Sequence, residues 1–248
     1  QLMTAITSRT ASGLMTILEH GERVDCHECV APLMNRVLTD DNAGAREYGA
    51  WWLRRRTFDA NMVFDYFART LESDADPVRR ARAAEAIGEF LTPFAVPLLT
   101  DAIENDADPG VREAAVRGLG RTNHVESQLG IATAMNDVSA PVRLAAVKQV
   151  NLINAFTQLD ALVGALGDED ARVRGEAALQ AGQRSVTDAV PALAALLIAD
   201  ESSSVRRSAA WALGAIGGAE ARTALGDAST TESDDNVMQA ITIAQRMR

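Results

Sequence analysis

The chain has 248 residues and a formal net charge of −10, from 34 acidic and 24 basic side chains. This acidic balance argues against a surface that follows nucleic-acid phosphates, so we expect no nucleic-acid partner. No run of about eighteen apolar residues occurs, so no membrane-spanning helix is predicted. Hydrophobic residues make up 47% of the chain and aromatic residues only 4%, a composition that favours closely packed helices with small side chains.

Residues 1–29 are predicted to cap the N-terminal end of the fold. Leu14 and Leu18 follow helical spacing, so Ala11–Glu19 is predicted as a capping helix. The chain starts at Gln1 rather than at methionine, so either an export signal was removed or the chain was trimmed. We expect the former, and therefore a bacterial protein that is periplasmic or otherwise exported, with a cytoplasmic location as the alternative.

The segment CHEC, from Cys26 to Cys29, holds both cysteines of the chain. One interpretation is a Cys26–Cys29 disulfide, which suits an exported protein. A second is a zinc site that uses Cys26, Cys29 and either His20 or His27, although a second ligand pair is missing. A third is redox chemistry, without the βαβ context of thioredoxin-like motifs. We favour a structural disulfide or a packed thiol pair, and so expect no metal and no cofactor, with zinc as the alternative.

From residue 30 onward the chain repeats a unit of 31 to 33 residues. A Val-Arg pair marks each unit, at Val78-Arg79, Val111-Arg112, Val142-Arg143, Val173-Arg174 and Val205-Arg206, with degenerate copies at Ala45-Arg46 and Val237-Met238. The cleanest copy, Ser204–Gly217, has apolar residues at helical spacing. A partner helical stretch precedes each pair, at Val30–Leu38, Asn61–Leu71, Phe94–Ile103, Val125–Met135, Phe156–Leu166, Asp188–Ile198 and Glu220–Asp227. Each unit is therefore predicted as a helical hairpin that must stack on its neighbours to bury its apolar faces.

Acidic turns precede most of the pairs, and we expect their Asp and Ser side chains to cap the following helix. The recurring arginines are expected to contact carboxylates of these turns and to brace adjacent repeats. They are Arg46, Arg79, Arg112, Arg143, Arg174 and Arg206. Glycines near the helix ends are expected to adopt the left-handed C-cap conformation, at Gly88, Gly120, Gly182, Gly214 and Gly217. Gly88 lies one residue further from Val78 than Gly214 lies from Val205, which predicts an irregularity in the second repeat.

One position of the second helices is predicted to be half exposed to solvent. Trp51 and Trp211 occupy it in two repeats, and Arg117, Lys148 and Leu179 occupy it in others. Exposed Trp and Arg carry a large share of interface energy, so we predict a protein-binding surface there. Its predicted residues are Trp51, Arg54, Arg55, Arg117, Lys148 and Trp211. Trp52, the next residue, is predicted to be buried.

The stretches DADPGVREAAVRGLG, DEDARVRGEAALQAG and SSSVRRSAAWALGAIG resemble HEAT-like repeats, especially the short form of phycobilisome-lyase-type proteins. The resemblance covers residues 30–248. It implies an all-α, right-handed α-α superhelix, a HEAT-like solenoid of about seven helical hairpins with an N-terminal capping helix. We expect residues 1–248 to form a single domain.

The sequence contains no phosphate-cradling glycine loop and no G-x-S-x-G elbow. We therefore predict a non-enzymatic scaffold that binds another protein through the concave face of the HEAT-like solenoid, and leave its oligomeric state open. One alternative is a metal- or redox-linked protein that uses Cys26, His27 and Cys29. The other is a lyase-type enzyme on the same scaffold, an activity that only the resemblance implies.

Overall fold

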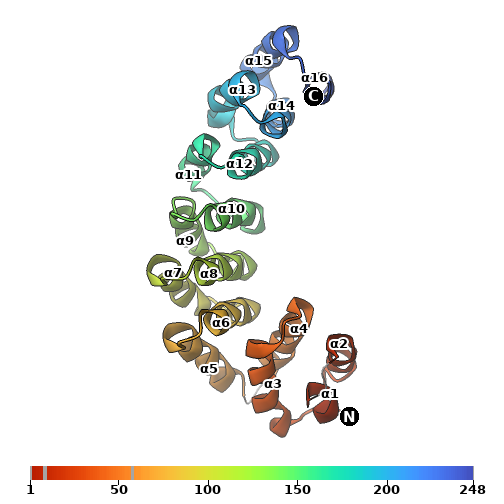
Figure 1. The fold of residues 1–248 in the computed structure, drawn as a ribbon, viewed down its shortest axis with the longest axis vertical. Helices are drawn as coiled ribbons and strands as arrows, with labels where there is room; N and C mark the ends of the chain where they lie inside the picture. The colour runs from red at the N-terminus through yellow and green to blue at the C-terminus, as the bar shows by residue number, and fades with distance from the viewer. Residues whose placement is uncertain (1, 8–9, 57–58, 248) are drawn as a thin grey trace. The chain divides into compact units, whose positions relative to one another are not determined.

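The computed structural model describes residues 2–7, 10–56 and 59–247. Over these residues it contains sixteen α-helices and no β-strand, which confirms the all-α prediction (Figure 1). Gln1, on which the expectation of a removed export signal depends, lies outside the described residues. Within the described part of the chain, the helices are too short or too polar to cross a membrane.

Seven helical hairpins follow one another from α3 to α16, as the repeats predict. The first helices are α3 (His27–Thr39), α5 (Ala60–Ser73), α7 (Ala95–Asn105), α9 (Ser127–Ala134), α11 (Leu159–Gly164), α13 (Val190–Ala199) and α15 (Gly218–Thr231). The second helices are α4 (Ala43–Arg54), α6 (Pro77–Glu89), α8 (Pro109–Thr122), α10 (Ala140–Gln149), α12 (Ala171–Gln183), α14 (Ser203–Ile216) and α16 (Asp235–Ala244). Three 3-10 turns join these helices, η1 (Val150–Leu152), η2 (Ala165–Gly167) and η3 (Thr187–Ala189).

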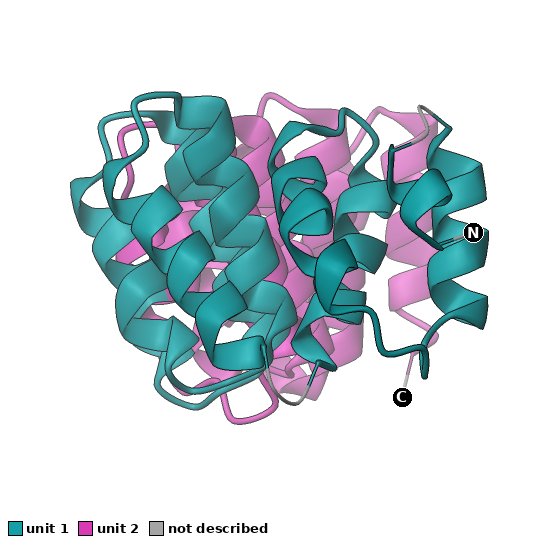
Figure 2. Cartoon of the chain, turned by 90° about the horizontal axis from the view of Figure 1, so that it is seen from below, with its two compact units in different colours: residues 1–130 teal, residues 131–248 magenta. Residues whose placement is uncertain are grey.

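The chain divides into two compact units, residues 1–130 and residues 131–248 (Figure 2). Within the first unit, α4 packs on α6 and α6 packs on α8. Within the second, α10 packs on α12, α12 on α14 and α14 on α16. Second helices therefore pack mainly on second helices of the neighbouring repeat. The description of residues 1–248 as a single domain stays a prediction.

The N-terminal cap consists of two helices, α1 (Leu2–Thr7) and α2 (Ala11–His20), where one was predicted. Helix α1 packs on α3 and α2 packs on α4, the same pairing that later hairpins make. Leu14, Leu18 and Trp52 are completely buried in this part of the core. The Trp52 indole donates a hydrogen bond from Nε1 to the Gly21 carbonyl oxygen, at 3.0 Å. The polar edge of this ring is thus satisfied although its surface is removed from water.

A repeated arginine–carboxylate contact joins successive turns, as predicted. In the second unit, Arg174 on α12 donates to both oxygens of Asp200, at 2.7 and 2.9 Å, and to the Asp168 carbonyl oxygen at 2.8 Å. Asp200 in turn accepts the Ser202 amide at 2.9 Å, just before α14. One carboxylate therefore receives the guanidinium of one repeat and fixes the turn of the next. Arg143 and Arg206 make the same contacts with Asp168 and Glu232.

The second repeat departs from the predicted pattern by one residue. Arg80, not Arg79, donates to both oxygens of Asp106, at 2.7 and 2.8 Å. Arg79 binds Asp74 of its own turn, at 2.8 Å. Val78 is 51% exposed, whereas Val111 is completely buried. The longer spacing before Gly88 moves the arginine that reaches the next turn from position 79 to position 80, so the prediction that Arg79 braces adjacent repeats is wrong.

The glycines of the second helices have a different role from the predicted one. Gly88 lies inside α6, where a Cβ atom would come within 2.6 Å of the Gly118 Cα atom on α8. Its absence lets the two backbones approach closely. Positive φ angles occur further along the chain, at Leu91, Asn123, Ser185, Gly217 and Gly218. Of the five predicted C-cap glycines, Gly217 alone among the described residues has a positive φ, and its ψ of −159° lies outside the left-handed helical region, so the prediction of left-handed C-caps is wrong for these glycines.

Candidate functional site

The candidate site lies on the second helices of the first unit, at the C-terminal end of α4. Trp51 is half-buried, and the Arg55 guanidinium lies 5.0 Å from the centre of its indole ring. Tyr48 approaches the same indole edge-on, with ring centres 6.1 Å apart. Arg55 also forms an ion pair with Glu22, and its side chain is 45% exposed. Aromatic and cationic groups are thus presented together to solvent.

A buried carboxylate stands beside this aromatic group. Glu89, at the end of α6, is 7% exposed and forms an ion pair with Arg121 of α8. Arg121 also binds Glu47 of α4 at 2.9 Å, and Arg54 donates to the Glu89 carbonyl oxygen at 2.9 Å. Burial raises the pKa of the Glu89 carboxyl, and the charge of Arg121 opposes this rise. Three consecutive second helices are joined by these contacts.

Arg117 belongs to the same charged face. It forms ion pairs with Glu113 of its own helix and, at 3.4 Å, with Glu85 of α6. Arg46 of α4 binds the other oxygen of Glu85 at 2.9 Å. The predicted binding arginines therefore have protein partners already, and an incoming anion would have to compete with Glu22, Glu85 or Glu113.

The six predicted binding residues fall in both units. Trp51, Arg54, Arg55 and Arg117 lie in the first. Lys148, exposed on α10, and Trp211, half-buried on α14, lie in the second. The Trp211 ring covers Gly182 of α12, where a Cβ atom would come within 2.7 Å of the ring. The structure brings Trp51, Arg54 and Arg55 together at one helix end, and the binding role of all six stays a prediction.

Three residues of this region were not predicted from the sequence. Glu89 and Arg121 lie in different repeats and meet only in the folded chain. Arg56 is buried, with its guanidinium 3.9 Å from the centre of the Trp52 ring. It donates to the carbonyl oxygens of Val24, at 2.6 Å, and of Glu22. The run of three arginines gave a signal, but only the fold separates the buried Arg56 from its exposed neighbour Arg55.

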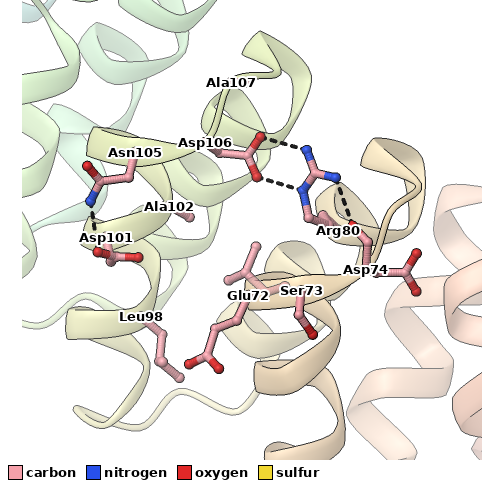
Figure 3. Close-up of a pocket in the computed structure, with 11 residues that line it drawn as sticks. Glu72, Ser73, Asp74, Arg80, Leu98, Asp101, Ala102, Asn105, Asp106 and Ala107 are labelled. Carbon is pink, nitrogen blue, oxygen red and sulfur yellow. Dashed lines mark hydrogen bonds and ion pairs between the residues drawn. The ribbon is translucent and has the colours of Figure 1, made fainter.

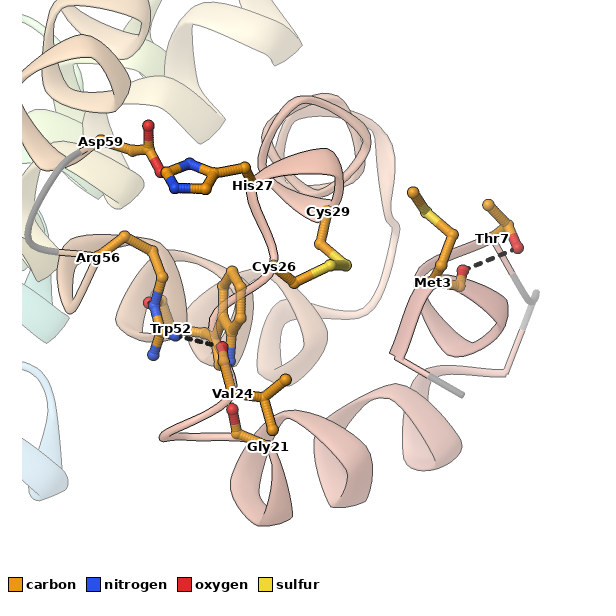
Figure 4. The surroundings of a disulfide bond; sticks show 10 residues. All are labelled: Met3, Thr7, Gly21, Val24, Cys26, His27, Cys29, Trp52, Arg56 and Asp59. Carbon is orange, nitrogen blue, oxygen red and sulfur yellow. Dashed lines mark hydrogen bonds and ion pairs between the residues drawn. A yellow bond between two sulfur atoms is a disulfide. The ribbon is translucent and has the colours of Figure 1, made fainter.

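The CHEC segment forms the start of α3 (Figure 4). Cys26 and Cys29 are joined by a disulfide. His27 points away from the sulfurs to Asp59, with Nδ1 2.9 Å from the carboxylate, and His20 Nδ1 lies 2.7 Å from the Thr16 carbonyl oxygen. Among the residues that the structure describes, no three His, Cys, Asp or Glu side chains gather where they could hold a metal ion. The four zinc candidates are therefore not brought together as a ligand set.

An open pocket of about 290 Å³ lies between α5 and α7 of the first unit (Figure 3). Carboxylates line it at Glu72, Asp74, Asp101 and Asp106. Its arginine, Arg80, is held by Asp106 and by the Asp74 carbonyl oxygen, at 2.9 Å. The pocket thus contains a brace between repeats, and it includes none of the predicted site residues.

Comparison with known proteins identifies the class. A family model described as HEAT repeats matches residues 30–120, 64–151 and 159–245. This chain belongs to the HEAT-repeat family, as the resemblance implied. Solved structures share the fold. One is the YibA protein of E. coli (18% identity, TM-score 0.62, covering 100% of this chain and 92% of that one), and another is yeast importin-β, Kap95p (10% identity, TM-score 0.65, 98% and 38%).

Curated relatives point to a narrower group. The chain is 32% identical over 141 residues to the phycocyanobilin lyase subunit alpha of Microchaete diplosiphon, covering 54% of this chain and 47% of that protein. It is 32% identical over 102 residues to the bilin biosynthesis protein PecE of Mastigocladus laminosus, covering 37% of each. The chain thus spans less than half the length of these relatives.

These relatives correct the main functional prediction. We predicted a non-enzymatic protein-binding scaffold, because the sequence contains no catalytic motif. That prediction is wrong, since the curated relatives are a lyase subunit and bilin biosynthesis proteins. The lyase-type alternative fits them better. The absence of a catalytic motif did not exclude an enzyme, because function depends on the geometry of a site, which need not carry a recognisable sequence signature.

Proposed function

We propose that this chain is a HEAT-repeat subunit of a bilin-lyase-type enzyme and that it binds the bilin. The observation that carries this proposal is the set of three curated relatives, which are 32 to 36% identical and all named for bilin chemistry. Because the chain spans less than half of those proteins, the proposal concerns one part of such an assembly. The first relative is named as a subunit, so we propose a second protein chain as the partner.

The charged and aromatic end of α4 suits this ligand. A bilin is a flat, conjugated open-chain tetrapyrrole that carries carboxylates. The Trp51 indole, with Tyr48 at its edge, offers an aromatic surface for such a ring. Arg55 lies over that indole and is partly exposed, so a bilin carboxylate would replace Glu22 as its partner. A carboxylate and a π-system would then be held by neighbouring residues of one helix end.

The chain's own contribution would be to bind and orient the chromophore. Holding two reactants in a fixed geometry accelerates their reaction by itself. The second helices of the first unit provide a rigid support, since Glu89 and Arg121 join α6 to α8 and Arg121 joins α8 to α4. The buried Glu89 stabilises this support and is not exposed to the ligand.

Titration of the purified chain with phycocyanobilin tests the proposal. We expect saturable binding, seen as a change in bilin absorbance and as quenching of tryptophan fluorescence. Trp51→Ala should weaken binding about tenfold, roughly 1.4 kcal/mol, because a stacked aromatic contact is lost. Trp211→Ala is the matched control in the second unit and should leave the affinity unchanged.

Two outcomes separate the function from the site. Absence of saturable bilin binding, together with no increase in bilin covalently attached to a chromophore-free biliprotein, would reject the function. If the chain binds bilin but Trp51→Ala and Trp211→Ala change the affinity equally, the proposed function stands and the proposed site at the end of α4 is wrong. Attachment is measured as bilin fluorescence on the acceptor protein after denaturing electrophoresis.

A further inference from the structure

The Cys26–Cys29 disulfide is not among the residues proposed to bind the bilin. We propose that this pair is a redox-active site that exchanges disulfide and dithiol states with the cysteines of a protein substrate. The two sulfurs belong to the only cysteines of the chain, and they differ in access. Cys29 is completely buried, whereas Cys26 is partly exposed. Cys26 is therefore the more accessible residue of the pair, and we assign to it the sulfur that an incoming thiolate attacks.

The surrounding fold does not depend on the disulfide. A bond between residues three apart closes a very short loop and restricts the unfolded chain little. The segment before Cys26 is held independently by α4, through the bond from Trp52 to the Gly21 carbonyl oxygen and those from Arg56 to Val24 and Glu22 (Figure 4). Reduction can therefore open the disulfide while the segment stays in place.

The position of Cys26 favours a reactive thiolate. Cys26 is the N-cap residue of α3, a helix of thirteen residues, and its side chain accepts no capping hydrogen bond while it is oxidised. After reduction, the amides of the first turn and the positive end of the helix dipole would stabilise a negative charge on its sulfur. The negative charges of Asp25 and Glu28, which lie nearby in the sequence, would instead disfavour the thiolate. The reactivity of Cys26 is therefore the quantity to measure.

The exchange proceeds in two balanced steps. A substrate thiolate attacks Cys26, the bond between the two cysteines breaks, and Cys29 leaves with the electron pair and takes up a proton. The second thiolate of the substrate then attacks the substrate sulfur that is bonded to Cys26. This attack expels the Cys26 thiolate, which is protonated in turn. The substrate loses two electrons and becomes a disulfide, while this chain gains them as two thiols. A substrate disulfide drives the same steps in reverse.

Equilibration of the whole chain with mixtures of reduced and oxidised glutathione gives the first test. After an acid quench, alkylation and mass spectrometry measure the reduced fraction. We expect this fraction to vary with the glutathione ratio, as for a labile disulfide. A pair that stays fully oxidised in excess reduced glutathione, and opens only with dithiothreitol, would be structural and would overturn the proposal.

Single-cysteine variants give the second test. Cys29→Ser leaves Cys26 alone, and should form a mixed disulfide with an oxidised two-cysteine peptide. Cys26→Ser leaves the buried Cys29. This variant should react with the peptide at least about tenfold more slowly than Cys29→Ser does. Equal rates would overturn the proposal. Circular dichroism of both variants and of Cys26→Ser/Cys29→Ser, which we expect to keep the helical signal, shows whether the comparison is made between folded proteins.

Discussion

Removal of Arg174 tests the brace between repeats most directly. In the native protein its guanidinium makes two hydrogen bonds with Asp200 and one with the Asp168 carbonyl oxygen. The side chains of Arg174 and Asp200 are only 11% and 3% exposed. Arg174→Ala would leave the Asp200 carboxylate buried with the Ser202 amide as its remaining donor in this contact.

The expected loss follows from that geometry. Breaking a buried ion pair by removing one partner costs about 3–5 kcal/mol, and the partial exposure of Arg174 reduces our expectation to about 2–4 kcal/mol. Asp200→Asn keeps an oxygen for the Ser202 amide but leaves the buried Arg174 guanidinium without a carboxylate, so it should also destabilise the fold. Asp200→Asn should therefore lower the free energy of unfolding less in the Arg174→Ala background than in the native protein. A double-mutant cycle measures this difference.

Urea unfolding followed by far-ultraviolet circular dichroism is the assay. Arg172→Ala is the matched control on the same helix, because the Arg172 side chain is 65% exposed and its guanidinium binds Asp170 of its own turn. We expect this control to leave the unfolding midpoint nearly unchanged. If Arg174→Ala and Arg172→Ala shift the midpoint equally little, the arginine contacts do not brace the repeats and our reasoning is wrong.

Three further predictions concern the core and pH. Trp52→Ala should cost about 3–5 kcal/mol of unfolding free energy in urea, because it empties a fully buried site, and a loss below that of Arg172→Ala would contradict it. Gly88→Ala should destabilise by about 1–3 kcal/mol, since its Cβ would strike the Gly118 backbone. Gly226 is a helical residue with open space where a Cβ atom would lie, so Gly226→Ala should instead stabilise the fold by up to about 1 kcal/mol. If both substitutions change the stability in the same direction, the close packing of α6 on α8 does not explain Gly88. Burial alone would raise the pKa of Asp200, but hydrogen bonds from Arg174 and the Ser202 amide leave it lowered. A carboxyl whose pKa is lower in the folded state stabilises the fold above its unfolded pKa of about 4, so stability should fall as the pH drops below about 4, and an unchanged urea midpoint from pH ~6 to ~3 would contradict this.

The fold could be predicted because the repeat period and the apolar spacing give the same answer. Each Val-Arg helix needs a neighbour, and the next unit supplies it. The arginine contacts between turns also followed from the sequence at Arg143, Arg174 and Arg206, but not at Arg46, which binds Glu85 of α6, nor in the second repeat, where Arg80 replaces Arg79. There the extra residue before Gly88 was visible, but whether the helix start or the turn absorbs it depends on packing against α8.

The glycines and the candidate site were less predictable for a common reason. Gly88 and Gly214 stand near helix ends, so local chemistry indicates a cap, whereas their actual constraint comes from Gly118 and Ala244 of the next repeats. The contact between Glu89 and Arg121 likewise joins residues of different repeats. A single sequence shows which residues share a helix face, but it does not show which of them meet across repeats.

The carboxylate that serves two repeats has a consequence for how such a chain can change its length. A segment from Asp168 to Ala199 carries one arginine of the brace, Arg174, and one acceptor carboxylate, Asp168. If that segment were duplicated, every arginine at a junction between repeats would still meet a carboxylate. Whole repeats can therefore be gained or lost with little loss of stability. Loss of one residue inside a unit would separate an arginine from its carboxylate, unless a second arginine stands beside the first, as at Arg79 and Arg80.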